Sequence, residues 1–415
     1  MFIQNNRIIE MKKIDVLHTG TLNSIIGPVQ TIKRVIKNHD YFIENGYDIT
    51  VISSDDMATT MASKIRGSES VVVKAMKRIS HWLMNYSWLY SYYRVRHLFK
   101  SSYPILNYYK SQKRIPDLIV FHSLFDCYIY LKHYRIDGVK VSCFTHSDGI
   151  LFKMLLMEFP RLKGGRIERK LMQIADYVMS NVDVKPCIAK IEEKNLLEGY
   201  PQLKGKTCLV VNAIDDFTDE QKEKIAQIKS EIPNFKYRLV SLGSVQRRKG
   251  QYTIVNAMNN LDDAILKNMH LSIVGTGPDV PVIEDYLEKN PRLKNHVCLL
   301  GAVKNTDVYT KLAPANIMVL MSENEGLPIS LIEGLRSGLA LISTNVSGIP
   351  ELIDEGDNGF LLEPSVEQLT DLLKKIGEYD WDAMGLKSRK KFEEYYTFTR
   401  MRSDYVKMLD KALAQ

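Results

Sequence analysis

Short apolar runs alternate with segments of helical periodicity along the whole chain. In the first such unit, an apolar run at residues 14–17 precedes a loop at 20–27, and apolar residues then recur at helical spacing: Val29, Ile32, Val35, Ile36 and Ile43. Gly46 predicts the end of this helix before a second apolar run at 49–52. The repeated order of strand, helix and strand predicts an α/β fold built on parallel sheets.

The remaining predicted strands form two series. The first series continues at residues 118–121, 139–144, 177–179 and 209–211, and the second comprises residues 237–242, 271–274, 297–300, 317–320, 340–343 and 360–362. A charged stretch at 215–229 separates them, so we place a domain boundary at Phe217. The sequence thus predicts two doubly wound Rossmann-like domains, 1–216 and 217–386. Residues 387–415 have a helical pattern too apolar for a free tail, and we expect them to pack back on the N-terminal domain.

The amino-acid composition indicates the class of protein and its cellular compartment. The 415 residues are 45% hydrophobic and 25% charged, values that exclude a mainly disordered or fibrous chain. The five cysteines are far apart and form neither a CxxC pair nor a Cys/His cluster, which favours a reducing compartment and predicts no metal site. Without a signal-peptide pattern or an apolar run of about 18 residues, we expect a cytoplasmic protein. Sequence leaves open whether residues 1–10, ahead of the first predicted strand, are native.

Charge is concentrated in the N-terminal part. The net charge is +7, yet residues 1–116 alone hold 17 Lys and Arg against eight Asp and Glu, or +9. Residues 71–116 contain nine basic residues and no acid, with tyrosine and tryptophan interleaved. This composition is typical of a segment that contacts an anionic membrane surface, where the protein would be peripheral on the inner face of the plasma membrane. An ordinary helical insertion is the alternative. No nucleic-acid-binding module surrounds these residues, so nucleic acid is not an expected partner.

The most informative segment follows the predicted strand at 317–320. Ligands of open α/β sheets bind beyond the carboxyl ends of strands, and here a polar turn contains Glu325 and Gly326. Pro328 is expected at the first position of a helix over 329–337, so that the turn and the backbone N–H groups at Leu327, Ile329 and Ser330 would face a phosphate. Glu333 lies one turn inside that helix. Taken alone, Glu325 could be a solvated loop acid and Glu333 a surface residue.

The neighbouring residues change that interpretation. The stretch EGLPISLIEG, with acids at Glu325 and Glu333, followed by GLALISTNVSGIPELI and NGFLL, resembles the signature of family 4 retaining glycosyltransferases, also called group 1 glycosyl transferases, of the GT-B fold. Gly334 stands where that family usually has Ala. The resemblance extends over nearly the whole chain and implies two Rossmann-like domains facing a central cleft.

The resemblance also implies donor-binding residues. LGSVQRRKG matches the family's turn after the first strand of the C-terminal domain, where a Lys and an Arg hold the donor diphosphate; Lys249 and Arg248 take those roles here, with Arg247 as the alternative. The family's usual Arg after the first glycine, Gly243, is replaced by Ser244. Two or three cations can balance a leaving diphosphate without a metal, so no metal is implied. Taken alone, Lys249 could be a solvated turn lysine.

Other family motifs occur in order. SIIGPVQ, with Gly27, matches the glycine-rich loop of the N-terminal domain, and CFTHSDG places His146 as the family's active-site histidine; His122 is a weaker candidate. A single histidine is otherwise more often structural. IVGTGPD, with Gly277, is interpreted as a turn beside the donor base, because it lacks the third glycine of a dinucleotide fingerprint. The one DxD sequence, at 380–382, is interpreted as surface.

The resemblance predicts an enzyme. It would transfer a sugar, with retention, from a UDP- or GDP-linked donor to a lipid-linked or glycan acceptor in cell-surface polysaccharide synthesis. Glu325 would contact the donor sugar and Glu333 the ribose. The alternatives are another GT-B chemistry, such as a phosphorylase or a nucleotide-sugar epimerase, and a non-catalytic nucleotide-sugar-binding partner. The donor sugar, acceptor, linkage and oligomeric state are not set by the sequence.

Overall fold

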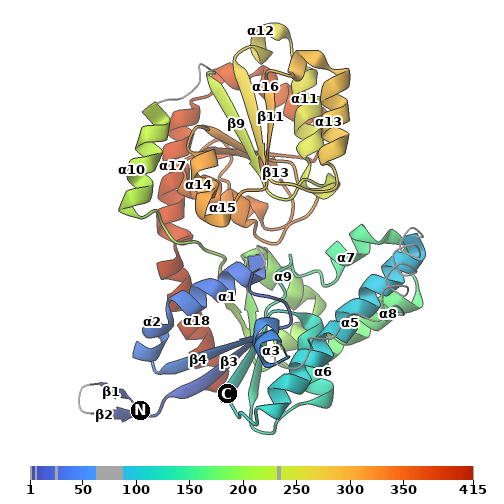
Figure 1. The fold of residues 1–415 in the computed structure, drawn as a ribbon, viewed down its shortest axis with the longest axis vertical. Coiled ribbons are helices and arrows are strands. Elements are labelled where there is room, and N and C mark those ends of the chain that lie inside the picture. The colour runs from blue at the N-terminus through green and yellow to red at the C-terminus, as the bar shows by residue number, and fades with distance from the viewer. Residues whose placement is uncertain (1, 5–6, 24–26, 62–86, 231–234, 415) are drawn as a thin grey trace. The chain divides into compact units, whose positions relative to one another are not determined.

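The computed structural model describes residues 2–4, 7–23, 27–61, 87–230 and 235–414. Contacts divide the chain into two compact units. The first comprises residues 1–188, 192–210 and 402–415, and the second comprises residues 189–191 and 211–401. Figure 1 shows the elements of each unit, which are described separately below.

The first unit is built on a parallel sheet of four strands in the order β4-β3-β5-β6. Its strands are β3 (Lys12–His18), β4 (Tyr47–Ser53), β5 (Leu118–Phe121) and β6 (Lys140–Cys143). The short parallel pair β7 (Lys185–Cys187) and β8 (Thr207–Leu209) continues it through a bridge between Ser142 and Val184. Near the N-terminus, β1 (Phe2–Gln4) and β2 (Arg7–Ile9) pair antiparallel.

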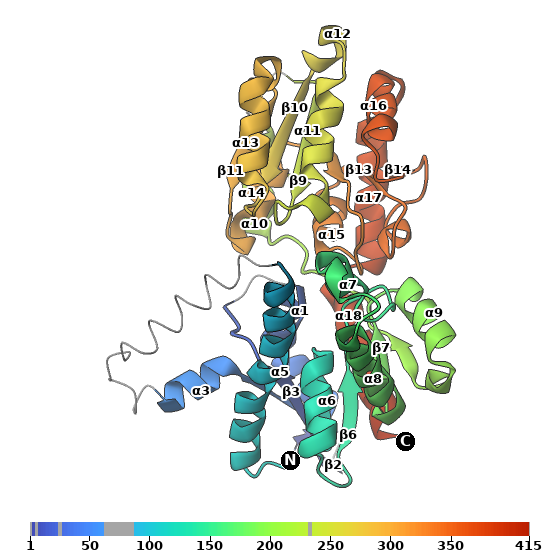
Figure 2. The ribbon, with the colours of Figure 1, turned by 90° about the vertical axis from the view of Figure 1, so that its right-hand side faces the viewer.

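Helices cover both faces of this sheet. They are α1 (Gly27–Lys37), α2 (His39–Glu44), α3 (Ser54–Met61), α5 (Ser87–Ser111), α6 (Leu124–His133), α7 (Lys153–Glu158), α8 (Arg166–Asn181) and α9 (Lys190–Gly199), with 3₁₀ turns η1 (Pro160–Leu162) and η2 (Pro201–Leu203). Figure 2 shows α5, α6 and α8 together on one side, where they bury a continuous apolar core against the strands. On the other side, Phe42 of α2 packs edge-on against Tyr405 of the C-terminal helix.

The second unit is a six-stranded parallel sheet in the order β11-β10-β9-β12-β13-β14. Its strands are β9 (Tyr237–Leu242), β10 (Met269–Val274), β11 (Val297–Gly301), β12 (Ile317–Leu320), β13 (Ala340–Thr344) and β14 (Gly359–Leu362). The helices are α10 (Asp219–Ser230), α11 (Gln251–Asn259), α12 (Asp263–Leu266), α13 (Val280–Lys289), α14 (Val308–Leu312), α15 (Ile329–Arg336), α16 (Val366–Lys374) and α17 (Trp381–Tyr395). The 3₁₀ turns are η3 (Arg247–Lys249), η4 (Pro291–Leu293), η5 (Asn305–Asp307), η6 (Ile349–Glu351) and η7 (Ile376–Glu378). In Figure 1, α11, α13 and α16 lie on one side of the sheet and α10, α14, α15 and α17 on the other, as in a doubly wound fold.

Most predicted strands are confirmed, but the strand at 177–179 is wrong. These residues lie inside α8, where Leu171, Ile174, Ala175, Val178 and Met179 are buried at helical spacing. The short strand β7 was missed. Its sequence, Lys-Pro-Cys, is three residues long and contains a buried lysine, so neither length nor apolarity marks it as a strand.

The C-terminal segment forms two helices instead of one. After α17 the chain leaves the helical conformation at Tyr396 and Thr397, and α18 (Phe398–Leu413) then begins. The helix is interrupted because the backbone of Ile214 forms hydrogen bonds with this segment. The amide of Ile214 donates to the carbonyl of Tyr396 (3.1 Å), and its carbonyl accepts from the amide of Phe398 (2.9 Å). α17 belongs to the second unit, whereas α18 from Arg402 onward belongs to the first.

Candidate active site

The loop after β9 places two cations beside the loop after β12. Arg248 and Lys249 lie in η3, and Gly250 follows with φ 72°, in the left-handed region. A Cβ at Gly250 would lie 2.2 Å from the carbonyl oxygen of Met321, so only glycine allows the two loops to come this close. The carbonyl of Arg248 also accepts a hydrogen bond from the amide of Glu323 at 2.9 Å.

Glu325 is the centre of this cluster. Its carboxylate is buried and accepts hydrogen bonds from the Lys249 ammonium (2.5 Å), the Ser322 hydroxyl (2.7 Å) and, at 3.4 Å, the Arg248 guanidinium. Arg248 also donates to the backbone carbonyl of Asn324. Two cations against one carboxylate leave a net charge of +1, and both cationic side chains remain partly exposed. The cluster can therefore accept an anion.

The helix expected after this turn is present, with one correction. α15 begins at Ile329, and Pro328 is its N-cap, in an extended conformation, rather than its first helical residue. No side chain caps this end of the helix. The turn is held from two sides, because the carbonyl of Gly326 accepts from the amide of Gly348 (3.0 Å) and that of Leu327 accepts from the Asn212 side chain (3.0 Å). The helix N-terminus thus adds a second feature that favours an anion.

Glu333 differs from Glu325 in its partner. It forms an ion pair with Arg336, one turn along the same helix. Arg336 also donates to the carbonyl of Asp215 (3.0 Å) and lies 4.2 Å from the centre of the Phe217 ring. Glu333 is therefore held by an arginine of its own helix.

The substitution of glycine for the family's usual alanine at position 334 has a steric explanation. A Cβ at Gly334 would lie 2.7 Å from the sulfur of Met318 and 3.0 Å from a methyl group of Leu341. Both side chains belong to strands beneath α15. The side chains of Met318 and Leu341 therefore occupy the space that an alanine methyl group at position 334 would need.

Gly243 and Gly277 lie on neighbouring loops of the same sheet edge. The parallel ladder continues past the strands here: the amide of Gly243 donates to Val274 and that of Val245 to Thr276, both at 3.0 Å. A Cβ at Gly277 would lie 2.1 Å from the carbonyl oxygen of Val245. This contact alone requires glycine, so its role beside the donor base stays a prediction.

Of the remaining candidates for the phosphate role, Arg247 is exposed and Arg248 contacts the Glu325 cluster. The sequence analysis did not identify Ser322 and Asn212 as supports for the turn. The only sequence signal for either residue is that it follows a predicted strand. Asp380 of the DxD sequence caps α17 by accepting from the amide of Ala383 at 3.0 Å.

His146 and Gly27 belong to the first unit. Gly27 is the first residue of α1. His146 follows β6 with φ 49°, a left-handed conformation that costs a non-glycine residue about 1–2 kcal/mol. His146 Nε2 and His122 Nδ1 are 2.9 Å apart, so the two histidine candidates form one hydrogen-bonded pair.

Both imidazoles are neutral at physiological pH. Burial, followed by the charges of Lys185 and His18, lowers the pKa of His146 to about 3. Burial, followed by His146 and His18, also lowers the pKa of His122 well below its usual value. A neutral imidazole pair can donate or accept hydrogen bonds with a hydroxyl without adding charge.

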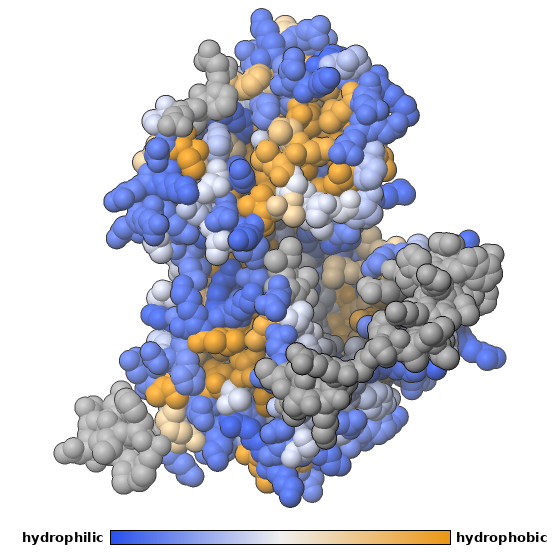
Figure 3. Space-filling view, in the orientation of Figure 1, coloured by the Kyte–Doolittle hydropathy of each residue, from blue (hydrophilic) through white to orange (hydrophobic). Residues whose placement is uncertain are grey.

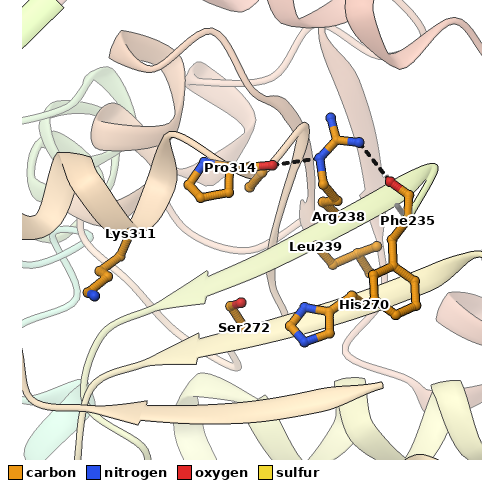
Figure 4. Close-up of a pocket in the computed structure, with 8 residues that line it drawn as sticks. Phe235, Arg238, Leu239, His270, Ser272, Lys311 and Pro314 are labelled. Atoms are coloured by element: carbon orange, nitrogen blue, oxygen red, sulfur yellow. Dashed lines mark hydrogen bonds between the residues drawn. The ribbon is translucent and has the colours of Figure 1, made fainter. Parts of the chain in front are cut away.

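A pocket in the second unit lies away from these residues. Figure 4 shows it beside β9, β10 and α14, lined by Arg238, His270, Ser272 and Lys311 among others, with Phe235 close to the His270 ring. Arg238 is held there by the carbonyls of Pro314 (2.6 Å) and Phe235 (2.7 Å). Arg238 and His270 lie near the starts of β9 and β10, whereas the candidate site follows the ends of the strands. Figure 3 shows a patch of apolar surface on one face of the second unit.

The described part of the chain holds neither a metal-ligand cluster nor a membrane-spanning helix. In the ranges given above, no three or more His, Cys, Asp or Glu side chains are grouped so that they could hold a metal ion. Across the same residues, every helix is too short or too polar to cross a bilayer.

Comparison with known families bears on the second unit. Residues 222–397 match the family model of glycosyl transferases group 1, a range that includes Lys249, Glu325 and Glu333. This part of the chain is therefore similar to group 1 glycosyl transferase domains. The resemblance inferred from the sequence is thus confirmed for this domain.

Curated relatives match part of this chain and part of their own length. The chain is 29% identical over 205 residues to N-acetyl-alpha-D-glucosaminyl L-malate synthase of Bacillus anthracis, covering 47% of this chain and 52% of that protein. It is 24% identical over 213 residues to the O-antigen biosynthesis glycosyltransferase WbnH of Escherichia coli, covering 51% of this chain and 56% of that protein. The matched region thus spans about half the length of these curated relatives.

Solved structures confirm the GT-B fold for the whole chain. Sucrose-phosphate synthase from Thermosynechococcus elongatus superposes with a TM-score of 0.70 at 14% identity, covering 97% of this chain and 99% of that one. Anabaena HepE, solved in complex with UDP, superposes with a TM-score of 0.66 at 12% identity, covering 96% and 100%. The prediction of two Rossmann-like domains is confirmed.

Proposed function

We propose that this protein is a retaining glycosyltransferase that uses a nucleotide-diphosphate sugar. The proposal rests chiefly on one arrangement, in which Lys249 and Arg248 meet the buried carboxylate of Glu325 beside the N-terminus of α15. This arrangement suits a ligand with a diphosphate next to a polyhydroxyl ring, because cations and helix N–H groups favour the anion while a carboxylate accepts from hydroxyls.

Each residue has a distinct proposed role. Lys249 and Arg248 bind the diphosphate and stabilise the negative charge that grows on it as the glycosidic bond breaks. Their cationic groups then turn from Glu325 toward the phosphate oxygens, which leaves Glu325 available to the hydroxyls of the transferred sugar. Glu333 accepts from the ribose hydroxyls. Gly243 and Gly277 allow the backbone to approach the nucleotide closely.

Retention follows from attack on the face from which the diphosphate departs. The acceptor hydroxyl forms the new bond to the anomeric carbon as the bond to the diphosphate breaks, and a departing phosphate oxygen takes the hydroxyl proton. No carboxylate nucleophile on the opposite face is required, unlike in retaining glycoside hydrolases with a covalent intermediate. His146 is proposed to contact the donor sugar as a neutral hydrogen-bonding group, with Gly27 lining the acceptor side.

The donor nucleotide is tested first by thermal stabilisation. UDP-linked and GDP-linked sugars are compared, and UDP is expected because Anabaena HepE was solved with UDP and UDP-glucose. A ligand at 100 times its Kd should stabilise the protein by about 2.7 kcal/mol. Lys249→Ala should lose most of the shift, whereas Lys267→Ala, an exposed lysine of the same unit, should keep it. Absence of a shift with all donors would contradict the proposal.

We propose that no metal takes part, because Arg248, Lys249 and the helix N-terminus can together balance the diphosphate. Turnover should be unchanged in EDTA. Complete loss that Mg²⁺ or Mn²⁺ restores would show that this part of the proposal is wrong.

Two alternative enzymes give different products. A phosphorylase would consume inorganic phosphate, and an epimerase would change the nucleotide sugar without an acceptor. A non-catalytic binding partner would show donor-dependent stabilisation with no product at all. Product analysis with a lipid-linked glycan acceptor therefore separates all three from transfer.

The acceptor is proposed to be lipid-linked, with the basic aromatic segment on an anionic membrane surface. Residues 71–86 of that segment lie outside the described residues. In α5, Val95, Ser102, Ile105, Leu106 and Tyr109 face the core. The exposed face contains Tyr92, Tyr93, Arg96, Lys100 and Tyr103 at helical spacing. Cations and tyrosines on one exposed face suit a headgroup layer.

Vesicle binding tests this face. Arg96→Glu with Lys100→Glu should lower co-sedimentation with anionic vesicles, and binding by the wild type should fall as salt rises, since exposed charges are screened within about 8 Å at physiological salt. The matched control, Lys224→Glu with Lys229→Glu on α10, makes the same charge change in the second unit. Equal binding by both variants would contradict the membrane proposal and would mean that α5 is an ordinary helix packed on the first unit.

A further inference from the structure

His146 is held in an unusual conformation, and the surrounding contacts show what holds it. The residue lies in a loop, residues 145–149, that follows β6 at the edge of the first unit's sheet. Its backbone is left-handed, which a histidine adopts only when its surroundings enforce it. The contacts that enforce it come from α9 on one side and from the loop after β5 on the other.

The α9 side is a buried charge pair. Lys185 of β7 and Glu192 of α9 are both fully buried, with Nζ and Oε1 3.1 Å apart. The second carboxylate oxygen accepts from the amide of Ile188 at 2.7 Å, and Lys185 also donates to the carbonyl of Pro186 at 2.5 Å. A pair so fully satisfied fixes the position of the Glu192 carboxylate.

Glu192 also contacts the loop, through the side chain of Thr145. The Thr145 hydroxyl donates to Glu192 Oε1, directly before His146. Two further contacts join α9 to the loop. The Asn195 side chain donates to the carbonyl of Asp148 at 2.7 Å, and a Cβ at Gly149 would lie 2.4 Å from the carbonyl oxygen of Glu192. Both ends of the loop, at Thr145 and at Asp148 and Gly149, therefore contact α9, and His146 lies between these contacts.

The imidazole itself is held by His122. The hydrogen bond between the two rings is 2.9 Å, and the rings are nearly parallel, with planes 20° apart. His122 in turn stacks on Phe144 with planes 5° apart. The side chain of His146 is therefore oriented separately from its backbone.

We propose that Glu192 and His122 are positioning residues that hold His146 for sugar transfer. Glu192, acting through Thr145, sets the backbone conformation, and His122 sets the ring orientation and tautomer. The inference rests on the proposed function for its effect on turnover. Its structural content does not, and this allows the two to be tested separately.

Thr145→Val is the most direct test. It removes the hydroxyl that links the loop to Glu192, keeps the side-chain shape, and leaves the Lys185 ion pair intact. We expect kcat to fall about tenfold with donor KM within about twofold, because a small misplacement of a reacting group lowers turnover more than binding. Thr145→Ser should restore wild-type values. Thr50→Val, on β4, is the matched control and should change nothing.

Imidazole nitrogen NMR of the full chain without ligand provides a readout independent of activity. The His146 signals, assigned by their loss in His146→Asn, should shift in Thr145→Val and in His122→Phe but stay in place in Thr145→Ser and Thr50→Val. If His146 signals and kcat are unchanged in both Thr145→Val and His122→Phe, the inference is overturned. If the wild type transfers no sugar, the proposed function fails, and the NMR comparison alone then decides whether the two residues hold His146.

Discussion

The two units place opposite kinds of chemistry at the carboxyl ends of their sheets. In the second unit, Lys249 and Arg248 surround the carboxylate of Glu325 and form ion pairs with it. In the first, the His122 and His146 rings are kept neutral by burial, which lowers the pKa of each. The charged cluster suits a diphosphate, and the neutral pair suits hydroxyl groups. The difference indicates that the second unit supplies the charged groups that would balance a diphosphate, whereas the first unit supplies neutral groups that would position hydroxyls.

The largest expected effect tests the charged cluster. Glu325→Gln keeps the side-chain size but removes the charge that would face the transferred sugar, so kcat should fall about 10²- to 10³-fold. Nucleotide affinity should change little, because Lys249 and Arg248 remain. Donor affinity and turnover are measured in parallel. The control is Glu323→Gln, on the same turn but exposed. A kcat within about threefold of the wild type would contradict the assignment of Glu325.

The second acid should behave differently. Glu333→Ala removes a proposed ribose contact that serves the ground state and the transition state alike, so donor Kd should rise about tenfold while kcat changes less. Calorimetric titration with the donor measures the affinity. Glu378→Ala, at an exposed site of the same unit, should have no effect. Loss of kcat with unchanged affinity would mean that the two acids have been assigned the wrong way round.

The smallest effect tests the neutral pair through pH. In the native state His146, with a pKa of about 3, binds no proton as the pH falls from about 6.5, whereas the unfolded chain does. The free energy of unfolding should therefore decrease as the pH falls below about 6.5, by at most about 1.4 kcal/mol per pH unit for this residue. His146→Asn should make the decrease shallower by about one proton, as measured by urea unfolding at several pH values.

The control for this experiment is His133→Asn, since His133 is exposed in the same unit. It should leave the pH dependence of unfolding at its wild-type slope. An unchanged slope in His146→Asn would show that His146 is not held neutral in the native state, and the contrast between the two units would then lose its basis.

Local pattern predicted much of the fold. Strands such as those at 237–242 and 317–320 match the sequence prediction to the residue, because buried strands of a parallel sheet are short, apolar and bounded by turns. The prediction failed where a helix and a strand look alike over three residues, as at 177–179. It also failed where Ile214, distant in sequence, occupies the backbone between α17 and α18.

The sequence by itself determined the alternation of strands and helices, the spacing of Glu325 and Glu333, and the cations near position 249. These properties lie within a few turns of chain, where periodicity and motif spacing are informative. Only the tertiary structure decided which of them meet. Lys249 and Glu325 are 76 residues apart, and Glu192 and Thr145 are 47 apart. It also decided that Glu333 pairs with Arg336 and that His146 is left-handed and neutral. Burial and partner geometry depend on packing between distant segments, which no local pattern encodes.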